Sequence, residues 1–287
     1  MTTGTESEIL KRLEEWESQK ESPPKPLEFY RQLLSIQLNA RRRAGIPDPG
    51  LSDIELNNRL MSGNPMLTFA DLSLDWSLVW DVFQDVATLC SEYPEVLCEI
   101  VEKPDSTSHL AALQEATETC FHNSELPPQL TIGSLKEVNL EFVVQASLRP
   151  FLLNHCQALL GRLNQEHWRR GYCPVCGGSP DFAFLDKDNG ARWLLCSRCD
   201  AQWLFHRLEC PHCGTQEPGA LSYFSDDQGL YRLYVCDRCR HYLKAIDLRQ
   251  ANSEVLLSLE RFLSLDLDIQ AHQNGFSPSR APGNKKQ

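Results

Sequence analysis

Apolar residues recur every three or four positions along the first part of the chain. Two such stripes open the sequence: Ile9, Leu10, Leu13 and Trp16, and then Phe29, Leu33, Ile36 and Ala40. This spacing puts the apolar side chains on one side of a helix, so both segments are predicted to be amphipathic helices. Prolines 23, 24 and 26 separate the two segments, and GIPDPG at 45–50 breaks the pattern after the second.

Three further helices are expected, at about 75–93, 106–122 and 134–167. Pro150 falls inside the last one, where a proline removes a backbone donor and should kink or split the helix. Residues 1–168 are therefore predicted to form a helical domain. Four cysteines of this domain stand singly among apolar neighbours and are expected to be small buried hydrophobes: Cys90, Cys98, Cys120 and Cys156.

The pattern becomes that of short strands after Gly171. The segments FAFL at 182–185 and ARWLLC at 191–196 flank DKDNG, whose Asn-Gly dipeptide predicts a tight hairpin turn. A similar arrangement follows, with LSYF at 221–224 and LYRLYVC at 230–236 on either side of SDDQG. Two β-hairpins are therefore predicted in the second half of the chain.

Each predicted hairpin lies between two Cys-x-x-Cys pairs. A pair followed by glycine precedes it, CPVCG at 173–177 and CPHCG at 210–214, and a pair without glycine ends it, CSRC at 196–199 and CDRC at 236–239. The glycine-bearing pairs are 37 residues apart and the others 40, which indicates an internal duplication.

Two thiolates in a Cys-x-x-Cys turn can bind one metal ion, and Gly177 and Gly214 can adopt the positive φ that lets such a turn close. Two turns at the ends of one hairpin complete a tetrahedral site. The predicted ligands are Cys173, Cys176, Cys196 and Cys199 for one ion, and Cys210, Cys213, Cys236 and Cys239 for a second. Four sulfurs leave no open position for substrate, which is typical of a structural site.

Other interpretations of the same residues are possible. A thioredoxin-like redox site needs a cysteine pair at a helix N-terminus, whereas these four pairs flank hairpins. His206, His212 and His241 lie near the cysteine pairs in the sequence and are possible metal ligands. Because eight cysteines already complete two four-ligand sites, the histidines are not expected to bind the metals. No phosphate-binding glycine loop, nucleophile elbow or His-Glu-x-x-His motif is found, so the sequence does not predict an enzyme.

Composition and charge narrow the function further. The chain of 287 residues has a net charge of −11, and residues 1–160 carry 24 Asp and Glu against 12 Lys and Arg. Nucleic-acid binding needs a basic surface, and only Arg41–Arg43 form even a short basic run. No stretch is long and apolar enough to span a membrane, and no secretory signal is visible. We therefore expect a cytoplasmic protein whose twelve cysteines are reduced.

Three segments, CPVCGGSP, CSRCDAQWLFHRLECPHCG and YVCDRCRHYLKAIDLR, resemble in order and spacing the FdhE family of formate dehydrogenase accessory proteins. The resemblance is most specific over about 171–250. It implies two rubredoxin-like sites holding iron, and no catalytic residues. Spacing alone permits zinc equally, because both metals accept four thiolates in a tetrahedron.

The resemblance also implies a cytoplasmic role in the maturation of formate dehydrogenase, with the immature catalytic subunit as partner. Two alternatives are a redox-active iron protein or thiol oxidoreductase acting on that subunit, and a zinc-ribbon nucleic-acid-binding protein, which the acidic charge disfavours. Trp203 and Arg207 are candidates for a partner-binding patch; the alternative is that Trp203 and Phe205 pack inside, with Arg207 at the edge. The sequence leaves the oligomeric state open.

The expected fold class is α+β, with a helical domain and two tandem antiparallel metal ribbons. The predicted boundaries are 1–168 for the helical domain, 169–207 and 208–249 for the ribbons, and 250–287 for a C-terminal helix and flexible tail. The helix is predicted over 251–264. The tail, rich in Gly, Pro and Ser, has no apolar period.

Overall fold

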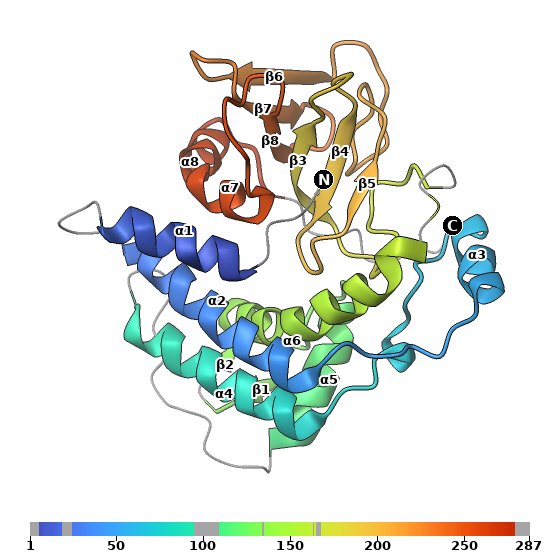
Figure 1. The fold of residues 1–287 in the computed structure, drawn as a ribbon, viewed down its shortest axis with the longest axis vertical. Helices are drawn as coiled ribbons and strands as arrows, with labels where there is room; N and C mark the ends of the chain where they lie inside the picture. Colours follow the sequence, from blue (N-terminus) through green and yellow to red (C-terminus); the bar gives the residue numbers. More distant parts are fainter. Residues whose placement is uncertain are drawn as a thin grey trace. The chain divides into compact units, whose positions relative to one another are not determined.

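The computed structural model describes residues 6–18, 25–94, 109–133, 135–162, 164 and 168–278. The chain divides into two compact units, and each is considered by itself. One comprises Gly4–Pro49 and Thr68–Ala158, and the other contains Gly50–Leu67 and Leu159–Gln287. Both are drawn in Figure 1. Of the helices in the described ranges, none combines the length and the apolar composition needed to cross a membrane.

The first unit is helical, as the apolar periodicity predicts. Its helices are α1 (Glu6–Ser18), α2 (Lys25–Ala44), α4 (Trp76–Glu92), α5 (Leu110–Phe121) and α6 (Glu137–Leu159). Its other elements are the short helix η1 (Phe69–Asp71) and a two-stranded ribbon, β1 (Thr131–Ile132) with β2 (Leu135–Lys136). α4 supplies much of the core through Val79, Phe83 and Val86. Apolar packing along this helix explains why its bounds agree with the periodicity.

Pro150 does not split α6, which runs through it from Glu137 to Leu159. Pro150 is itself buried, and Phe151 beside it belongs to the core, so packing stabilises a helix that local propensity disfavours. Cys90, Cys120 and Cys156 are buried free thiols, as expected, whereas Cys98 lies outside the described residues.

In the second unit, an unforeseen helix, α3 (Asp53–Met61), precedes the cysteine-rich region. Ser52 begins it with a capping box: its side chain accepts a hydrogen bond from the Glu55 backbone, and the Glu55 carboxylate accepts one from the Ser52 N–H. Each bond satisfies an otherwise free backbone group at the helix start. After α3 the chain passes along the first cysteine turn, so residues 50–67 group with the C-terminal half.

A six-stranded sheet forms the centre of this unit (Figure 1). Its strands are β3 (Pro180–Leu185), β4 (Arg192–Cys196), β5 (Gln202–Leu204), β6 (Leu221–Ser225), β7 (Tyr231–Cys236) and β8 (Tyr242–Asp247), in the order β5-β4-β3-β8-β7-β6. Both predicted hairpins are present, β3 with β4 and β6 with β7. Each gains a third antiparallel strand, and β3 pairs in parallel with β8. The two ribbons thus share one sheet, and the predicted α+β class is confirmed.

The C-terminal region differs from its prediction. Residues 251–256 are not helical, and two helices follow them instead, α7 (Leu257–Leu263) and α8 (Leu265–Gln273). Elsewhere in this unit, the short helix η3 (Leu160–Arg162) precedes the strands. Leu257 packs on one face of the sheet and Ala271 on the same face further along. The start of the predicted tail is also ordered: Phe276 is buried, and the Tyr242 N–H donates to the Ser277 carbonyl. Burial of this one aromatic side chain outweighs the polar composition around it.

Candidate metal centres

The four cysteine turns repeat the same backbone hydrogen bonds. The Cys173 N–H donates to the Gly178 carbonyl and the Gly177 N–H to the Cys173 carbonyl, at 2.8 and 3.0 Å. At the corresponding positions of the second ribbon, Cys210 bonds Thr215 and Gly214 bonds Cys210, at 3.0 and 2.9 Å. The glycine-free turns also match, since Cys196 and Cys236 donate to Ala201 and His241 at 3.0 Å each. The duplication seen in the sequence is therefore a duplication of structure.

Every turn places the residue after its second cysteine in the left-handed region. Gly177 and Gly214 have φ values of +72° and +69°, as expected. The two turns without glycine do the same with Asp200 and Arg240, at +53° and +59°. A residue with a side chain is strained in the left-handed region. Asp200 and Arg240 therefore carry local strain, and their turns still have the same backbone geometry as the two glycine turns.

The structure brings the eight cysteines together as two groups of four, in the pairing expected from the sequence. Within each group all Sγ atoms lie within 4.8 Å of one another. In the first, the Cys173–Cys199 and Cys176–Cys196 sulfurs are both 3.5 Å apart. In the second, the equivalent separations, Cys210–Cys239 and Cys213–Cys236, are 3.7 and 3.8 Å.

These separations fit a tetrahedral metal. Four sulfurs at about 2.3 Å from one ion lie about 3.8 Å from each other, which is the edge of that tetrahedron. Backbone N–H groups also point at the sulfurs: Val175 donates to Cys173 Sγ at 3.3 Å, and Arg198 to Cys196 Sγ at 3.4 Å. Such bonds favour the thiolate form that a metal requires. Each group can therefore hold one ion.

The first group is enclosed. All four of its cysteines are buried, and residues 65–67 run along its first turn. The N–H groups of Met66 and Leu67 donate to the carbonyls of Pro174 and Val175 at 2.8 and 2.9 Å. Met66 is itself buried, and its carbonyl accepts a hydrogen bond from Arg59 in α3 at 2.7 Å. The unforeseen segment 50–67 is thus a cover over the first site.

The second group is partly open. Cys210 and Cys236 are buried, but Cys213 is exposed and Cys239 is half-buried. Burial raises the pKa of Cys239 to about 11. Burial also acts to raise the pKa of Cys236, but hydrogen bonds from the N–H groups of Cys239 and Arg238 outweigh it, and the pKa falls below its ordinary value.

In the enclosed group, burial and the three neighbouring cysteines raise the pKa of Cys173 well above its ordinary value. Buried thiolates so close together repel one another and lack water to solvate them. A bound cation removes both costs, which is why this sulfur geometry suits metal binding better than it suits four free thiols.

Other residues singled out in the sequence lie outside the two groups. His206 is exposed, and His212 and His241 pack against each other with ring centroids 5.5 Å apart. Trp203 has 0% exposure, and its Nε1 donates to the Arg170 carbonyl at 2.8 Å. Phe205 is buried beside it while Arg207 is exposed, as the packing alternative expects.

Asp200 and Arg240 are site residues that sequence reasoning missed. Asp200 joins its turn to α7, because its carboxylate accepts hydrogen bonds from Ser258 and Arg261, both at 2.9 Å. Arg240 lies over the Phe276 ring at 3.9 Å and donates to the Asn274 carbonyl at 2.9 Å. Their place directly after Cys-x-x-Cys, where the other two turns have glycine, is the signal that identifies them.

The sequence of this chain is similar to those of known proteins. Residues 172–207 match the family described as "FdhE, central domain". An FdhE homologue of Aquifex aeolicus is 28% identical over 230 residues, covering 79% of this chain and 76% of that protein. FdhE of an Escherichia coli O127:H6 strain is 29% identical over 141 residues, covering 47% of this chain and 45% of the relative, so the match spans less than half of that protein.

The fold is also similar to that of a solved structure. The crystal structure of the FdhE protein from Pseudomonas aeruginosa matches 99% of this chain and 96% of its own, with a TM-score of 0.63 and 20% identity. The family match contains all four cysteines of the enclosed group, and the similarity to FdhE homologues extends well beyond it. In sequence, in fold and in its first four-cysteine group, this chain is therefore similar to proteins of the FdhE family.

Proposed function

We propose that this protein is a cytoplasmic accessory protein of formate dehydrogenase that binds the enzyme's immature catalytic subunit. In this proposal it is not itself an enzyme. The observation that carries it is the pair of complete four-sulfur groups, one of which lies within the FdhE family match. A complete sulfur shell leaves no position at which a substrate can bind the metal, which suits a scaffold for protein recognition.

Each group holds one metal ion in this proposal, giving two per chain. Iron is favoured by the resemblance to the family, and zinc is the alternative because both accept four thiolates. Metal analysis of protein purified without oxygen distinguishes them. A content of two iron ions per chain would support the proposal. Two zinc ions per chain would show that the metal is zinc, without contradicting the accessory role.

An accessory protein must release its finished client. We therefore expect tighter binding to the catalytic subunit that lacks its cofactor than to the mature subunit. A tenfold preference requires only about 1.4 kcal/mol of differential binding free energy. Titration of both client forms with one preparation of the metal-loaded protein measures this difference. Equal affinities would contradict selective binding of the immature client.

Loss of the protein in cells gives an independent test. Deletion should abolish formate oxidation, while the purified protein alone should show no formate activity. Restoring the gene with Cys176→Ser, which removes a ligand from the enclosed group, should restore less activity than the wild-type gene. Full formate dehydrogenase activity in the deletion strain would overturn the accessory role.

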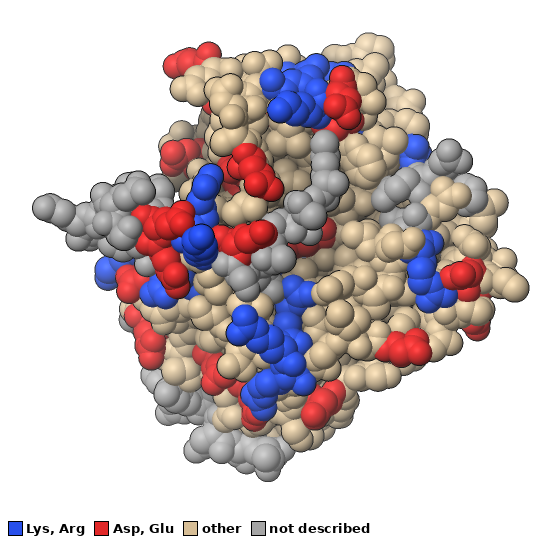
Figure 2. Space-filling model, in the orientation of Figure 1, with Lys and Arg blue, Asp and Glu red and all other residues tan. Residues whose placement is uncertain are grey.

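The partial exposure of the second group favours one alternative function. Electron transfer requires a metal near the surface, and Cys213 is exposed there. A reversible change in the visible spectrum on reduction, coupled to oxidation or reduction of the client, would favour this alternative. For the nucleic-acid alternative, the net charge of −11 is unfavourable, and acidic and basic side chains are intermixed on the face drawn in Figure 2.

A further inference from the structure

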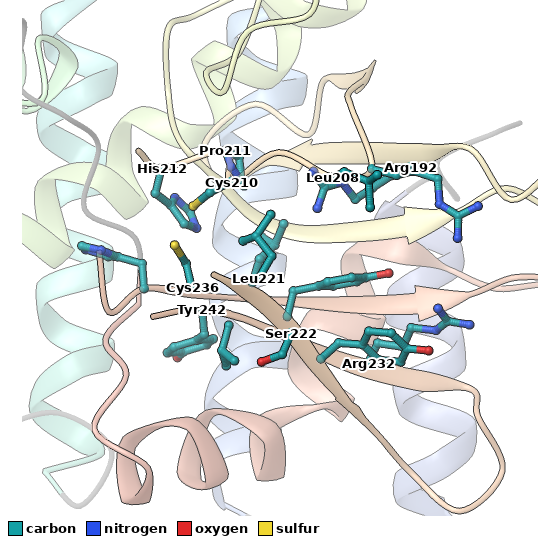
Figure 3. A pocket seen from close by; sticks show the side chains of 16 residues that line it. Arg192, Leu208, Cys210, Pro211, His212, Leu221, Ser222, Arg232, Cys236 and Tyr242 are labelled. Carbon is teal, nitrogen blue, oxygen red and sulfur yellow. The ribbon is translucent and has the colours of Figure 1, made fainter. Parts of the chain in front are cut away.

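A pocket of about 240 Å³ lies beside the second cysteine group (Figure 3). Cys210, Cys236 and His212 lie at one end of it, and Arg192 and Arg232 lie toward the other. The pocket draws residues from both ribbons. It is therefore formed by the shared sheet, and neither hairpin alone would build it.

The pocket centres on the sheet face that α7 and α8 leave free. Along β7, Leu233 and Val235 belong to the cluster that includes Ala271 of α8. Arg232 and Tyr234 alternate with them, so their side chains project to the opposite face, where both line the pocket. Tyr223 of β6 pairs with Tyr234 across the strands and adds a second aromatic ring.

The charge of the pocket is opposite to that of the chain. Three arginines line it, Arg192, Arg207 and Arg232, and none of the described lining residues is Asp or Glu. The whole chain carries a net charge of −11. Arg232 pairs with Asp247 at 2.6 Å, whereas Arg192 and Arg207 form no ion pair with a described residue. These two cationic side chains in a concave site can attract an anion.

Arg192 is the most unusual of the three. It is 2% exposed and forms no ion pair within 4 Å with a described residue, although Cys210 and Glu209 lie near enough to act on its charge. One of its terminal nitrogens donates to the carbonyl oxygens of His206 and Glu209, while its Nε is buried without an acceptor. An unpaired buried guanidinium is costly, and an anion in the pocket would supply the missing charge.

Two further buried nitrogens in the pocket have no hydrogen-bond partner, Arg232 Nε and His212 Nε2. Aromatic rings hold the guanidinium groups in place: Arg192 lies over Tyr234 at 5.6 Å and Arg232 over Tyr223 at 4.8 Å. Stacking occupies the faces of a guanidinium and leaves its N–H edges for planar acceptors. One terminal nitrogen of Arg232 already donates to Asp247, so its Nε is the donor that remains. Carboxylates and phosphates are the groups that accept from such edges.

We propose that this pocket binds a small molecule that carries a carboxylate or phosphate on an apolar body. The arginine edges take the oxyanion, and the walls formed by Leu221, Leu243 and the two tyrosines take the apolar part. Leu208 is 81% exposed at the pocket and adds to this apolar wall. The site does not depend on the accessory role, so either proposal can fail alone.

Calorimetric titration of the metal-loaded full chain with matched probes tests the site. Benzoate and phenyl phosphate should each bind once per chain, at least about tenfold more tightly than neutral benzamide. The better of the two identifies the oxyanion, and weaker binding of inorganic phosphate than of phenyl phosphate supports the apolar wall. If Arg192 only offsets the charge of the cysteine group, benzoate and benzamide will bind equally, which would overturn the proposal.

Variants locate the binding. Arg207→Ala changes an exposed side chain at the pocket and should weaken benzoate binding about tenfold. Arg238→Ala is the matched control, because Arg238 is also exposed in this unit but pairs with Glu217 away from the pocket. Arg192→Met should remove binding. If that variant does not fold, the comparison of Arg207→Ala with Arg238→Ala decides, and equal affinities in those two would contradict the site.

Discussion

Gly171 lies directly against the carbonyl oxygen of Pro211: a β-carbon at position 171 would be 1.9 Å from that oxygen. Gly171 precedes the first cysteine turn, and Pro211 lies within the third, so the contact joins the two ribbons. Because the obstacle is backbone, Gly171→Ala should force the ribbons apart and lower the free energy of unfolding by about 1–3 kcal/mol or more. Urea denaturation measures this. Gly161→Ala, where nothing lies within 4 Å, is the control and should change stability little.

Backbone strain at Gly214 can be tested separately from packing. Gly214 has φ +69° and nothing within 4 Å of an added β-carbon, so Gly214→Ala changes only the cost of the left-handed conformation, about 1–2 kcal/mol. Competition with a chelator should show weaker metal binding by the second group. Gly219 has φ +85° and equally open surroundings but is outside the cysteine turns. Gly219→Ala should therefore lower stability without weakening the metal, and an equal metal loss in both would refute a local effect.

The two metal groups should differ in reactivity. Cys213 is exposed, whereas all four cysteines of the other group are buried, and the segment containing Met66 runs along the first turn of that group. Iodoacetamide should modify Cys213 first, and a chelator should remove one metal equivalent faster than the other. Mass spectrometry of the modified peptides and a colorimetric metal assay measure the order. Cys213→Ser should leave only the slow equivalent and Cys176→Ser only the fast one; simultaneous loss in the wild type would contradict the difference.

Asp247 should make stability depend on pH. Its carboxylate is fully buried and pairs with Arg249 at 2.7 Å and Arg232 at 2.6 Å. Hydrogen bonds from Arg249, and the charges of both arginines, hold the pKa of Asp247 below its ordinary value. Asp247→Asn should therefore cost about 2–3 kcal/mol at neutral pH.

Because the folded pKa of Asp247 is depressed, its stabilisation is fully present above the unfolded pKa of about 3.9 and is lost as pH falls through the folded value. Urea titrations of the wild type and Asp247→Asn should thus differ equally at pH 7 and pH 5, and converge only in stronger acid. Comparing the two proteins cancels metal loss common to both. Convergence already at pH 5 would show that another group controls the difference.

Local patterns were sufficient to predict the helices of the first unit, the two hairpins and the grouping of the eight cysteines. Each depends on residues close in sequence, such as the alternation that flanks Asn189-Gly190 or the spacing from Cys173 to Cys176. Gly177 and Gly214 were also predictable, since glycine after a cysteine pair has a direct conformational reason.

Features that join distant segments were not predictable. The pairing of Phe182 with Lys244 in parallel strands has no local sequence pattern, and neither does the contact of Met66 with Pro174. The left-handed conformation of Arg240 could not be predicted, because a residue with a side chain disfavours it locally. Contacts with the distant residues Phe276 and Asn274 stabilise it. The exposed Cys213 and the buried Cys176 likewise look alike in sequence, because burial depends on what covers each turn.

The parallel pairing of β3 with β8 also imposes an order on synthesis of the protein by the ribosome. β3 can pair with β4 soon after both emerge, but its other edge stays open until β8 has been made about 60 residues later. At 5–20 residues per second this interval is roughly 3–12 s. During it the nascent chain exposes the edge of an apolar strand containing Phe182 and Phe184, a known hazard for aggregation. A stop codon between the two ribbons would make that exposure permanent.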